Sequence, residues 1–160
     1  GERIKIIEFF SRTKDIDLYG VGWDKRPHFP YWFYKSAVQR VYKGSVESKD
    51  QKLSEYTFAI ATENNVTPGF IGEALFDCFY VGTIPVYLGA PDITEYVPKN
   101  CFIDMRDFKS YEELRKFLKS LSVIQIASYK ESARKFLESE QYKPFTNEYF
   151  AKTLVDACVV

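Results

Sequence analysis

Two carboxylates and one carboxamide stand at the ends of apolar segments in the middle of this sequence. Glu63 and Asn64 follow the apolar run YTFAIAT, residues 56–62, and Glu73 lies nine positions after Asn64, within a second apolar segment. Carboxylates can accept hydrogen bonds from ribose or sugar hydroxyls, and the free N–H groups of a helix start attract a phosphate. The three residues together can therefore hold a nucleotide or a nucleotide sugar.

A strand, a helix and a second strand must position these side chains. The unbroken apolar character of 56–62 predicts a strand that is covered on both faces, as in parallel sheets. Residues 70–81 (FIGEALFDCFYV) predict a mostly apolar helix that is stopped by Gly82, and TIPVYLG predicts the next strand. This order is one βαβ unit, in which Glu63, Asn64 and Glu73 share the carboxyl end of the sheet.

The rest of the chain continues the alternation of strands and helices. Short strands are predicted at DIDLYG and NCFIDM, and helices at 2–12, 110–120, 122–139 and 146 to about 157. Ser110 with Glu113 three residues later is a capping-box pattern. We therefore expect an α/β fold with a Rossmann-like open parallel sheet and flanking helices, which binds ligands at the carboxyl ends of its strands.

The residue pattern alone leaves a second interpretation open. Glu63-Asn64 can simply form a turn, and Glu73 can simply stabilise the positive end of a helix dipole. Neither role requires a ligand.

Composition limits the classes of function. The chain has 160 residues, which suits one domain, and its 22 basic and 22 acidic residues cancel, so nothing favours general attraction to nucleic acid or to an anionic membrane surface. No window approaches the roughly 18 apolar residues of a membrane span. The three cysteines, Cys78, Cys101 and Cys158, are widely spaced among apolar neighbours, which predicts buried thiols in a reducing compartment rather than a disulfide framework. We expect a cytoplasmic domain of a longer protein.

Several other patterns carry less chemistry. The DID at 15–17 has the form of a metal-binding motif, but two carboxylates on a solvated strand edge are common. His28 has no second ligand nearby, and Trp23 and Trp32 share its irregular loop. One histidine completes no Ser-His-Asp or Cys-His arrangement, and a Walker-type glycine loop is absent from the sequence, so hydrolase and ATPase functions are not expected.

Residues from about 40 to 150 resemble the C-terminal donor-binding domain of the family 10 glycosyltransferases, the α1,3/4-fucosyltransferases, in the bacterial form. The motifs that carry the resemblance are ATENN, GFIGEALFDCFYVGTIPVYLGAPD and CFIDMRDF, in the order and with the spacing of that family. The resemblance implies the C-terminal half of a GT-B fold.

The resemblance also implies roles for particular residues. It places Asn64, with Glu63 before it, near the diphosphate of the donor, and Glu73 on the ribose hydroxyls. Phe70 stands where the family has a tyrosine near the nucleotide, and Arg3 falls on an arginine that contacts phosphate. These five are the expected substrate-binding residues.

The sequence departs from the family at the next position. Ala74 stands where the family has a phosphate-binding lysine, and Gly72 replaces a threonine. Loss of such a charge would cost about 3–4 kcal/mol of transition-state stabilisation, by analogy with the loss of an oxyanion donor. Either Arg3 or Lys49 compensates, or the site is impaired.

The function implied by the resemblance is that of the GDP-fucose-binding domain of an inverting fucosyltransferase acting on a glycan hydroxyl, with an α1,3 linkage expected. No catalytic residue is expected in residues 1–160, because in this family the base lies in an N-terminal domain. No metal, cofactor or nucleic-acid partner is expected. The glycan acceptor would be bound through the missing domain, and the protein would work in the bacterial cytoplasm at the inner face of the membrane, in lipopolysaccharide or capsule synthesis. The alternatives are a non-catalytic nucleotide-sugar-binding or structural module, and a transferase that uses another nucleotide sugar.

Overall fold

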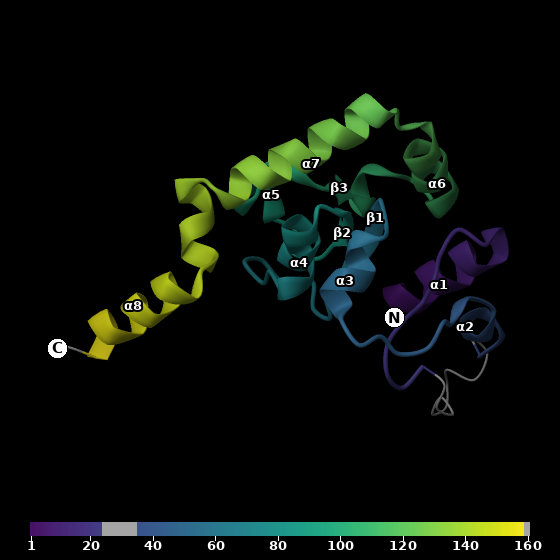
Figure 1. Cartoon of the computed structure of the whole chain (residues 1–160), viewed down its shortest axis with the longest axis horizontal. Coiled ribbons are helices and arrows are strands. Elements are labelled where there is room, and N and C mark those ends of the chain that lie inside the picture. Colours follow the sequence, from purple (N-terminus) through teal and green to yellow (C-terminus); the bar gives the residue numbers. More distant parts are fainter. Residues whose placement is uncertain (24–34, 159–160) are drawn as a thin grey trace.

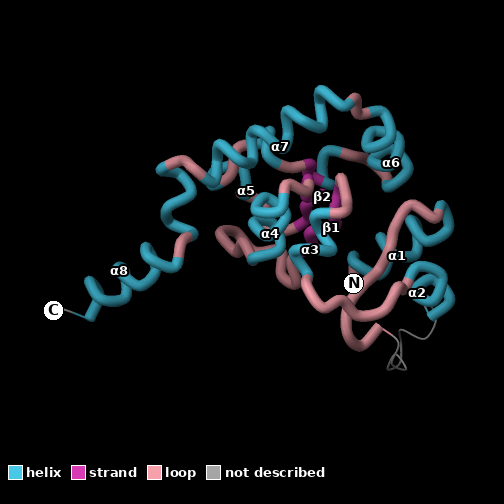
Figure 2. Tube along the Cα trace, in the orientation of Figure 1, coloured by secondary structure: helices cyan, strands magenta, loops and turns pink. Residues whose placement is uncertain are grey.

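Three parallel strands lie at the centre of the molecule. The computed structural model describes residues 1–23 and 35–158, and its sheet has the order β1 (Phe58–Thr62), β2 (Ile84–Leu88), β3 (Ile103–Asp104). Phe58 stands opposite Ile84, and the parallel register continues to Thr62 opposite Leu88. Figure 2 shows the short strands enclosed by helices and loops. The predicted βαβ unit and open parallel sheet are confirmed.

Helices make up most of the described chain, as Figure 1 shows. The α-helices are α1 (Glu2–Thr13), α2 (Lys35–Val41), α3 (Lys49–Ser54), α4 (Glu73–Val81), α5 (Ile93–Tyr96), α6 (Tyr111–Ser120), α7 (Val123–Leu137) and α8 (Asn147–Cys158). Short 3-10 turns lie at η2 (Lys99–Cys101), η3 (Met105–Asp107) and η4 (Glu140–Phe145). None of the helices in the described ranges is long and apolar enough to cross a membrane.

Two apolar clusters cover the two faces of the sheet. Side chains alternate between faces along a strand, so Ile84 and Val86 point to one side and Tyr87 to the other. The first pair packs with Ile6 and Phe10 of α1 and with residues of α6. Tyr87 packs with residues of α4 and α7. The sheet is therefore the middle layer between two sets of helices.

The helix after β1 begins three residues later than its apolar pattern predicts. Gly72 is the N-cap in an extended conformation, and α4 starts at Glu73. The apolar side chains of Phe70 and Ile71 extend the pattern backwards, although both residues belong to the preceding loop. Gly82 ends α4 with a φ of 73°, in the left-handed region that glycine adopts at little cost, as expected.

The expected strand at DIDLYG is wrong. Leu18 forms only an isolated parallel bridge with Tyr42, which leaves three strands in the described sheet instead of four. The expectation that β1 is covered on both faces is also wrong for its first three residues, which are half-buried. The edge of β1 that faces away from β2 has no neighbouring strand in the described chain.

Two helix starts show how the serine caps work. Ser110 accepts a hydrogen bond from Glu113 N at 3.2 Å, but the Glu113 carboxylate accepts from Lys109 N, so the predicted capping box is only half formed. Ser122 and Gln125 form the complete box at the start of α7. This second box was not predicted, although the sequence pattern predicts the helix at 122–139.

The cysteines differ in their surroundings. Cys78 and Cys101 are buried, and burial raises their thiol pKa values to about 12 and about 11. Cys158 is exposed on α8, which corrects the expectation of three buried thiols. This last helix projects away from the sheet in Figure 1. Its apolar residues Phe150, Leu154 and Val155 are at least half exposed.

The carboxyl ends of β1 and β2 are packed closely around Gly89. A Cβ atom at this position would overlap both the Tyr87 hydroxyl and the Glu63 side chain. Tyr87 is fully buried, and its hydroxyl accepts a hydrogen bond from Ala90 N at 3.0 Å. Burial raises the pKa of Tyr87, against the opposing effect of that bond. The ring therefore has no room to retreat.

We predict that Gly89→Ala destabilises the protein by about 1–3 kcal/mol, the usual cost of overpacking. Gly72→Ala is the matched control. A Cβ there would meet Glu63 Oε2 at 2.6 Å, and the carboxylate can turn away at the cost of its hydrogen bond from Gly72 N, about 1 kcal/mol, so a smaller loss than in Gly89→Ala is expected. Urea unfolding of the two variants and the parent chain measures the difference. An equal or larger loss in Gly72→Ala would show that Tyr87 yields more easily than its burial indicates.

Candidate functional site

Arg3 joins the start of α1 to the carboxyl end of β1. Its Nε donates to Thr62 Oγ1 at 3.0 Å, and its Nη2 donates to the Thr62 carbonyl oxygen at 2.9 Å and to Asn64 Oδ1 at 3.2 Å. Arg3 and Asn64 are exposed, whereas Thr62 is buried. A guanidinium group is thus held at the edge of the sheet with the amide nitrogen of Asn64 beside it.

Both the N–H group and the carboxylate of Glu63 form hydrogen bonds with the protein's own backbone. Its N–H donates to the Leu88 carbonyl at 2.9 Å, which continues the parallel pairing one residue past β1. Its carboxylate accepts from Gly72 N at 2.8 Å, across nine residues of chain. Glu63 therefore ties the end of β1 to the start of α4, and Gly72 is suited to this position because a Cβ would meet the same carboxylate.

A type II turn carries Phe70 between the end of β1 and the start of α4. Phe70 N donates to the Thr67 carbonyl at 3.1 Å, with Pro68 and Gly69 in the central positions and a Gly69 φ of 72°. Gly69 N donates in turn to Asp92 Oδ1 at 3.0 Å, from the loop after β2. The Phe70 ring is 48% exposed, so an apolar surface stands at the rim of the site.

Glu73 is the first residue of α4 and is exposed. The N-cap Gly72 has no side chain to cap the first amides of α4, and its own N–H is taken by the Glu63 carboxylate. Ala74, in contrast, is half-buried against the cluster on the α4 side of the sheet.

Lys49 is committed to a different partner. Its ammonium group lies 2.5 Å from Asp77 Oδ2, and this hydrogen bond, with the attraction of Glu73, raises the pKa of Lys49. Asp77 lies one turn further along α4 than Glu73. Of the two cations that the sequence offers as substitutes for the family lysine, Arg3 is the one in contact with the carboxyl end of β1.

The structure thus brings the five sequence-derived candidates to one edge of the sheet. Arg3 contacts Asn64 directly, Glu63 contacts the residue before Glu73, and the turn carries Phe70 between them. Thr62 and Asp92 were missed. The sequence pattern indicates only that Thr62 is the last residue of a strand and that Asp92 belongs to a polar loop. Because Asp92 follows YLGAP at the end of β2, it could have been expected at the same edge of the sheet.

The minor candidates that the structure describes have partners within the protein or lie in a turn. In the described ranges no group of three or more His, Cys, Asp or Glu side chains could hold a metal ion. Asp15 pairs with Arg115 and Lys119, and Asp17 accepts from Tyr56 at 2.8 Å. His28 and Trp32 lie outside the described residues, and Trp23 stands in a turn at their boundary.

Curated proteins similar to this chain are fucosyltransferases. An alpha-(1,3)-fucosyltransferase of Helicobacter pylori is 31% identical over 77 residues, which are 48% of this chain and 16% of the relative. An alpha-(1,4)-fucosyltransferase of Arabidopsis thaliana is 35% identical over 69 residues, 43% of this chain and 17% of the relative. The chain therefore spans less than a fifth of these relatives. Because plant and animal proteins match as well, the bacterial type stays a prediction.

Solved structures of the same kind share the fold. A crystal structure of an alpha1,3-fucosyltransferase with GDP superposes with a TM-score of 0.50 at 27% identity, over 57% of this chain and 27% of the other. A structure with GDP-fucose gives 0.51 at 20% identity, over 83% and 44%, which is evidence for the fold alone. The described sheet and its flanking helices are thus the C-terminal half of a GT-B fold.

The profile described as "Glycosyltransferase family 10 (fucosyltransferase) C-term" matches residues 1–158. Its span takes in Arg3, Glu63, Asn64 and Glu73 together with the elements that position them. This chain belongs to glycosyltransferase family 10, as a C-terminal domain of the fucosyltransferase type.

Proposed function

We propose that this chain binds GDP-fucose at the carboxyl ends of β1 and β2 and serves as the donor domain of an inverting fucosyltransferase. One observation carries the proposal: the Arg3 guanidinium is held on Thr62 and Asn64, at the edge of a parallel sheet where nucleotides bind. The solved relatives that contain GDP and GDP-fucose support the choice of ligand.

Each residue has a distinct part in the proposed complex. Glu73, exposed at the start of α4, accepts hydrogen bonds from the ribose hydroxyls. Arg3, the Asn64 amide and the first N–H groups of α4 face the diphosphate, and Phe70 gives the nucleotide an apolar contact. As the bond from fucose to phosphate breaks, the same groups stabilise the negative charge that develops on the leaving GDP.

The transfer itself needs a group outside these residues. An acceptor hydroxyl attacks the anomeric carbon of fucose from the face opposite to GDP, and a carboxylate takes the hydroxyl proton. We place that base and the acceptor surface in an N-terminal domain. The 160 residues then form one nucleotide-sugar-binding domain, with an α1,3 linkage as the expected product.

Local charge sets the expected affinity. Two carboxylates, Glu63 and Glu73, stand at the site with one guanidinium group that is already engaged in three hydrogen bonds. A helix start adds only about 0.3–1 kcal/mol when exposed. With Ala74 in place of a lysine, millimolar binding of GDP is expected.

The cellular setting follows from the bacterial resemblance. We propose a bacterial protein that works in the cytoplasm at the inner face of the membrane, held there by segments outside this chain, in the synthesis of lipopolysaccharide or capsule. A non-catalytic nucleotide-sugar-binding module is the second candidate. The specific observation in its favour is Ala74, which leaves the diphosphate without its usual cation.

We predict that Glu73→Ala abolishes the weak binding of GDP and that Asn64→Ala weakens it. The ribose contacts to Glu73 are charge-assisted hydrogen bonds worth about 1.5–3 kcal/mol, the largest polar contribution in the site. Calorimetric titration with GDP measures both variants. Glu95→Ala, at an exposed position of α5, is the control for a lost carboxylate. Unchanged affinity in Glu73→Ala would remove this residue from the site.

Ala74→Lys should tighten GDP binding and make it more sensitive to salt, because a Coulombic attraction is screened by ions. The lysine stem can lie along the half-buried surface that Ala74 occupies while its ammonium group reaches the diphosphate. Titrations at two salt concentrations decide this, with Ala74→Met as the uncharged control. If the affinity of Ala74→Lys equals that of Ala74→Met, residue 74 does not face the diphosphate.

The 160-residue chain alone should transfer fucose far more slowly than an ordinary enzyme. A complete transferase turns over on the order of 1 per second or faster, and this chain lacks the proposed base. The measurement is the release of GDP from GDP-fucose with a glycan acceptor present. Turnover at an ordinary rate would place the base within residues 1–160 and contradict the proposal that it lies in an N-terminal domain.

A further inference from the structure

Asp92 stands at the start of a short helix but does not cap it. It is the N-cap residue of α5, and its carboxylate makes no hydrogen bond with the first amides of that helix. An aspartate at an N-cap ordinarily accepts such a bond, which stabilises the helix. Here Asp92 Oδ1 instead accepts a hydrogen bond from Gly69 N at 3.0 Å. The carboxylate is therefore directed from the loop after β2 to the loop after β1.

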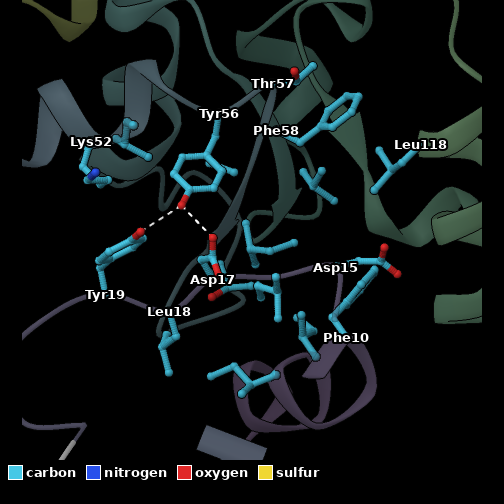
Figure 3. A pocket seen from close by; sticks show the side chains of 18 of the residues that line it. Phe10, Asp15, Asp17, Leu18, Tyr19, Lys52, Tyr56, Thr57, Phe58 and Leu118 are labelled. Carbon is cyan, nitrogen blue, oxygen red and sulfur yellow. Dashed lines mark hydrogen bonds between the residues drawn. The ribbon is translucent and has the colours of Figure 1, made fainter. Parts of the chain in front are cut away.

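An aspartate at the opposite end of β1 shows a different use of its carboxylate. An apolar groove of about 820 Å³ runs along the open edge of β1, and Asp17 is one of the residues that line it. Asp17 accepts from the Tyr56 hydroxyl at 2.8 Å, as a dashed line in Figure 3 shows, and lies 3.5 Å from Lys43 Nζ. Among the described residues, the bond from Gly69 N is the one hydrogen bond that the Asp92 carboxylate makes. Asp92 therefore holds a backbone group and not a charged partner.

The segment that carries Asp92 is firmly packed. The next residue, Ile93, and the later Val97 are fully buried in the cluster on the α4 side of the sheet. Tyr96, the last residue of α5, lies close to the same glycine, because its hydroxyl is 3.6 Å from the point where a Gly69 Cβ would stand. The core thus fixes the position from which the Asp92 carboxylate reaches Gly69.

Phe70 lies between two fixed points of the loop after β1. Gly69 N is held by Asp92, and Gly72 N donates to the Glu63 carboxylate at 2.8 Å. Between them Ile71 packs against the core, whereas the Phe70 ring is about half exposed at the rim of the ligand edge. Loss of the bond from Gly69 would free the residue directly before Phe70, while Ile71 and Gly72 after it stay in place.

We propose that Asp92 is a positioning residue for the nucleobase of the donor, and that it acts through Gly69 on the Phe70 ring. The inference rests on the proposed function, in which Phe70 gives the nucleotide an apolar contact. The base is the part of GDP that presents a flat face to an aromatic ring, and such stacking depends on the placement of the ring. Asp92 itself touches no ligand. It restricts the loop before binding, so less conformational entropy is lost when the base stacks on Phe70.

Asp92→Asn and Asp92→Ala test the proposal as a matched pair. Both remove the charge, but only the asparagine keeps a side-chain oxygen that can accept from Gly69 N. In NMR titrations with GDP, Asp92→Ala should bind about 5-fold more weakly than Asp92→Asn, the equivalent of one hydrogen bond. Glu95→Gln and Glu95→Ala, at an exposed position of α5, are the control pair and should bind GDP equally.

Two NMR signals report the positioning directly. Without ligand, the Gly69 amide should exchange with water faster in Asp92→Ala than in Asp92→Asn, because only the first variant lacks its acceptor. With GDP bound to the same extent, magnetisation transfer between the Phe70 ring protons and the guanine H8 proton should be strong in the parent chain and in Asp92→Asn. It should be weaker in Asp92→Ala, in which the ring is less firmly placed.

The other outcomes overturn the proposal. If Asp92→Ala binds GDP as tightly as Asp92→Asn, or if the Gly69 amide exchanges equally in both, Asp92 positions nothing, although the proposed function stands. A Phe70-to-H8 signal that is equal in the two variants, or absent from the parent chain, would mean that Asp92 does not act through Phe70. If the parent chain binds no GDP at all, the proposed function fails and this inference fails with it.

Discussion

The carboxylate of Glu63 connects the end of β1 to the start of α4 at the ligand edge of the sheet. Its backbone continues the pairing of β1 with β2, while its side chain holds Gly72, the residue on which α4 starts. Without that bond, the loop between them would keep its own turn, its bond to Asp92 and the packing of Ile71 against the core. A half-buried carboxylate that accepts a backbone N–H thus decides where Phe70 and Glu73 stand. This dependence also accounts for the two close glycines, because Gly72 and Gly89 both lie against the Glu63 side chain.

Sequence patterns predicted those parts of the fold that depend on local periodicity. The apolar run before Glu63, the glycine stop at Gly82 and the second strand are each encoded within a few residues, so the βαβ unit followed directly. The strand at DIDLYG could not be judged in that way, because a strand exists only with a neighbour and the described chain gives Leu18 only a bridge to Tyr42. For the site, motif spacing predicted that Asn64 and Glu73 share one edge of the sheet, whereas Arg3 was assigned from the family resemblance alone. The inward use of the Glu63 carboxylate depends on a contact across nine residues, which no periodicity displays.

The electrostatic balance of the site depends on where its one contacting cation comes from. In the family pattern a lysine follows the glutamate on α4, whereas here Ala74 packs against the core and Lys49 is drawn to Asp77. Arg3 comes from a different helix, and its guanidinium group is directed by Thr62 and Asn64. A cation fixed by three hydrogen bonds loses little entropy when it meets a phosphate, but it must share its donors between ligand and protein. In the proposed complex with GDP, this rigidity offsets part of the attraction that a lysine at position 74 would supply.

Arg3 also links the site to the open edge of β1. The carbonyl that it binds belongs to Thr62, which is the last backbone group on the side of the groove. Because Arg3 belongs to α1, a shift of α1 along the edge of β1 would also shift the guanidinium group at the ligand edge. The half-buried residues Phe58 and Ile60 and the bond from Arg3 to the Thr62 carbonyl belong to the same strand, whose edge away from β2 has no neighbouring strand in the described residues.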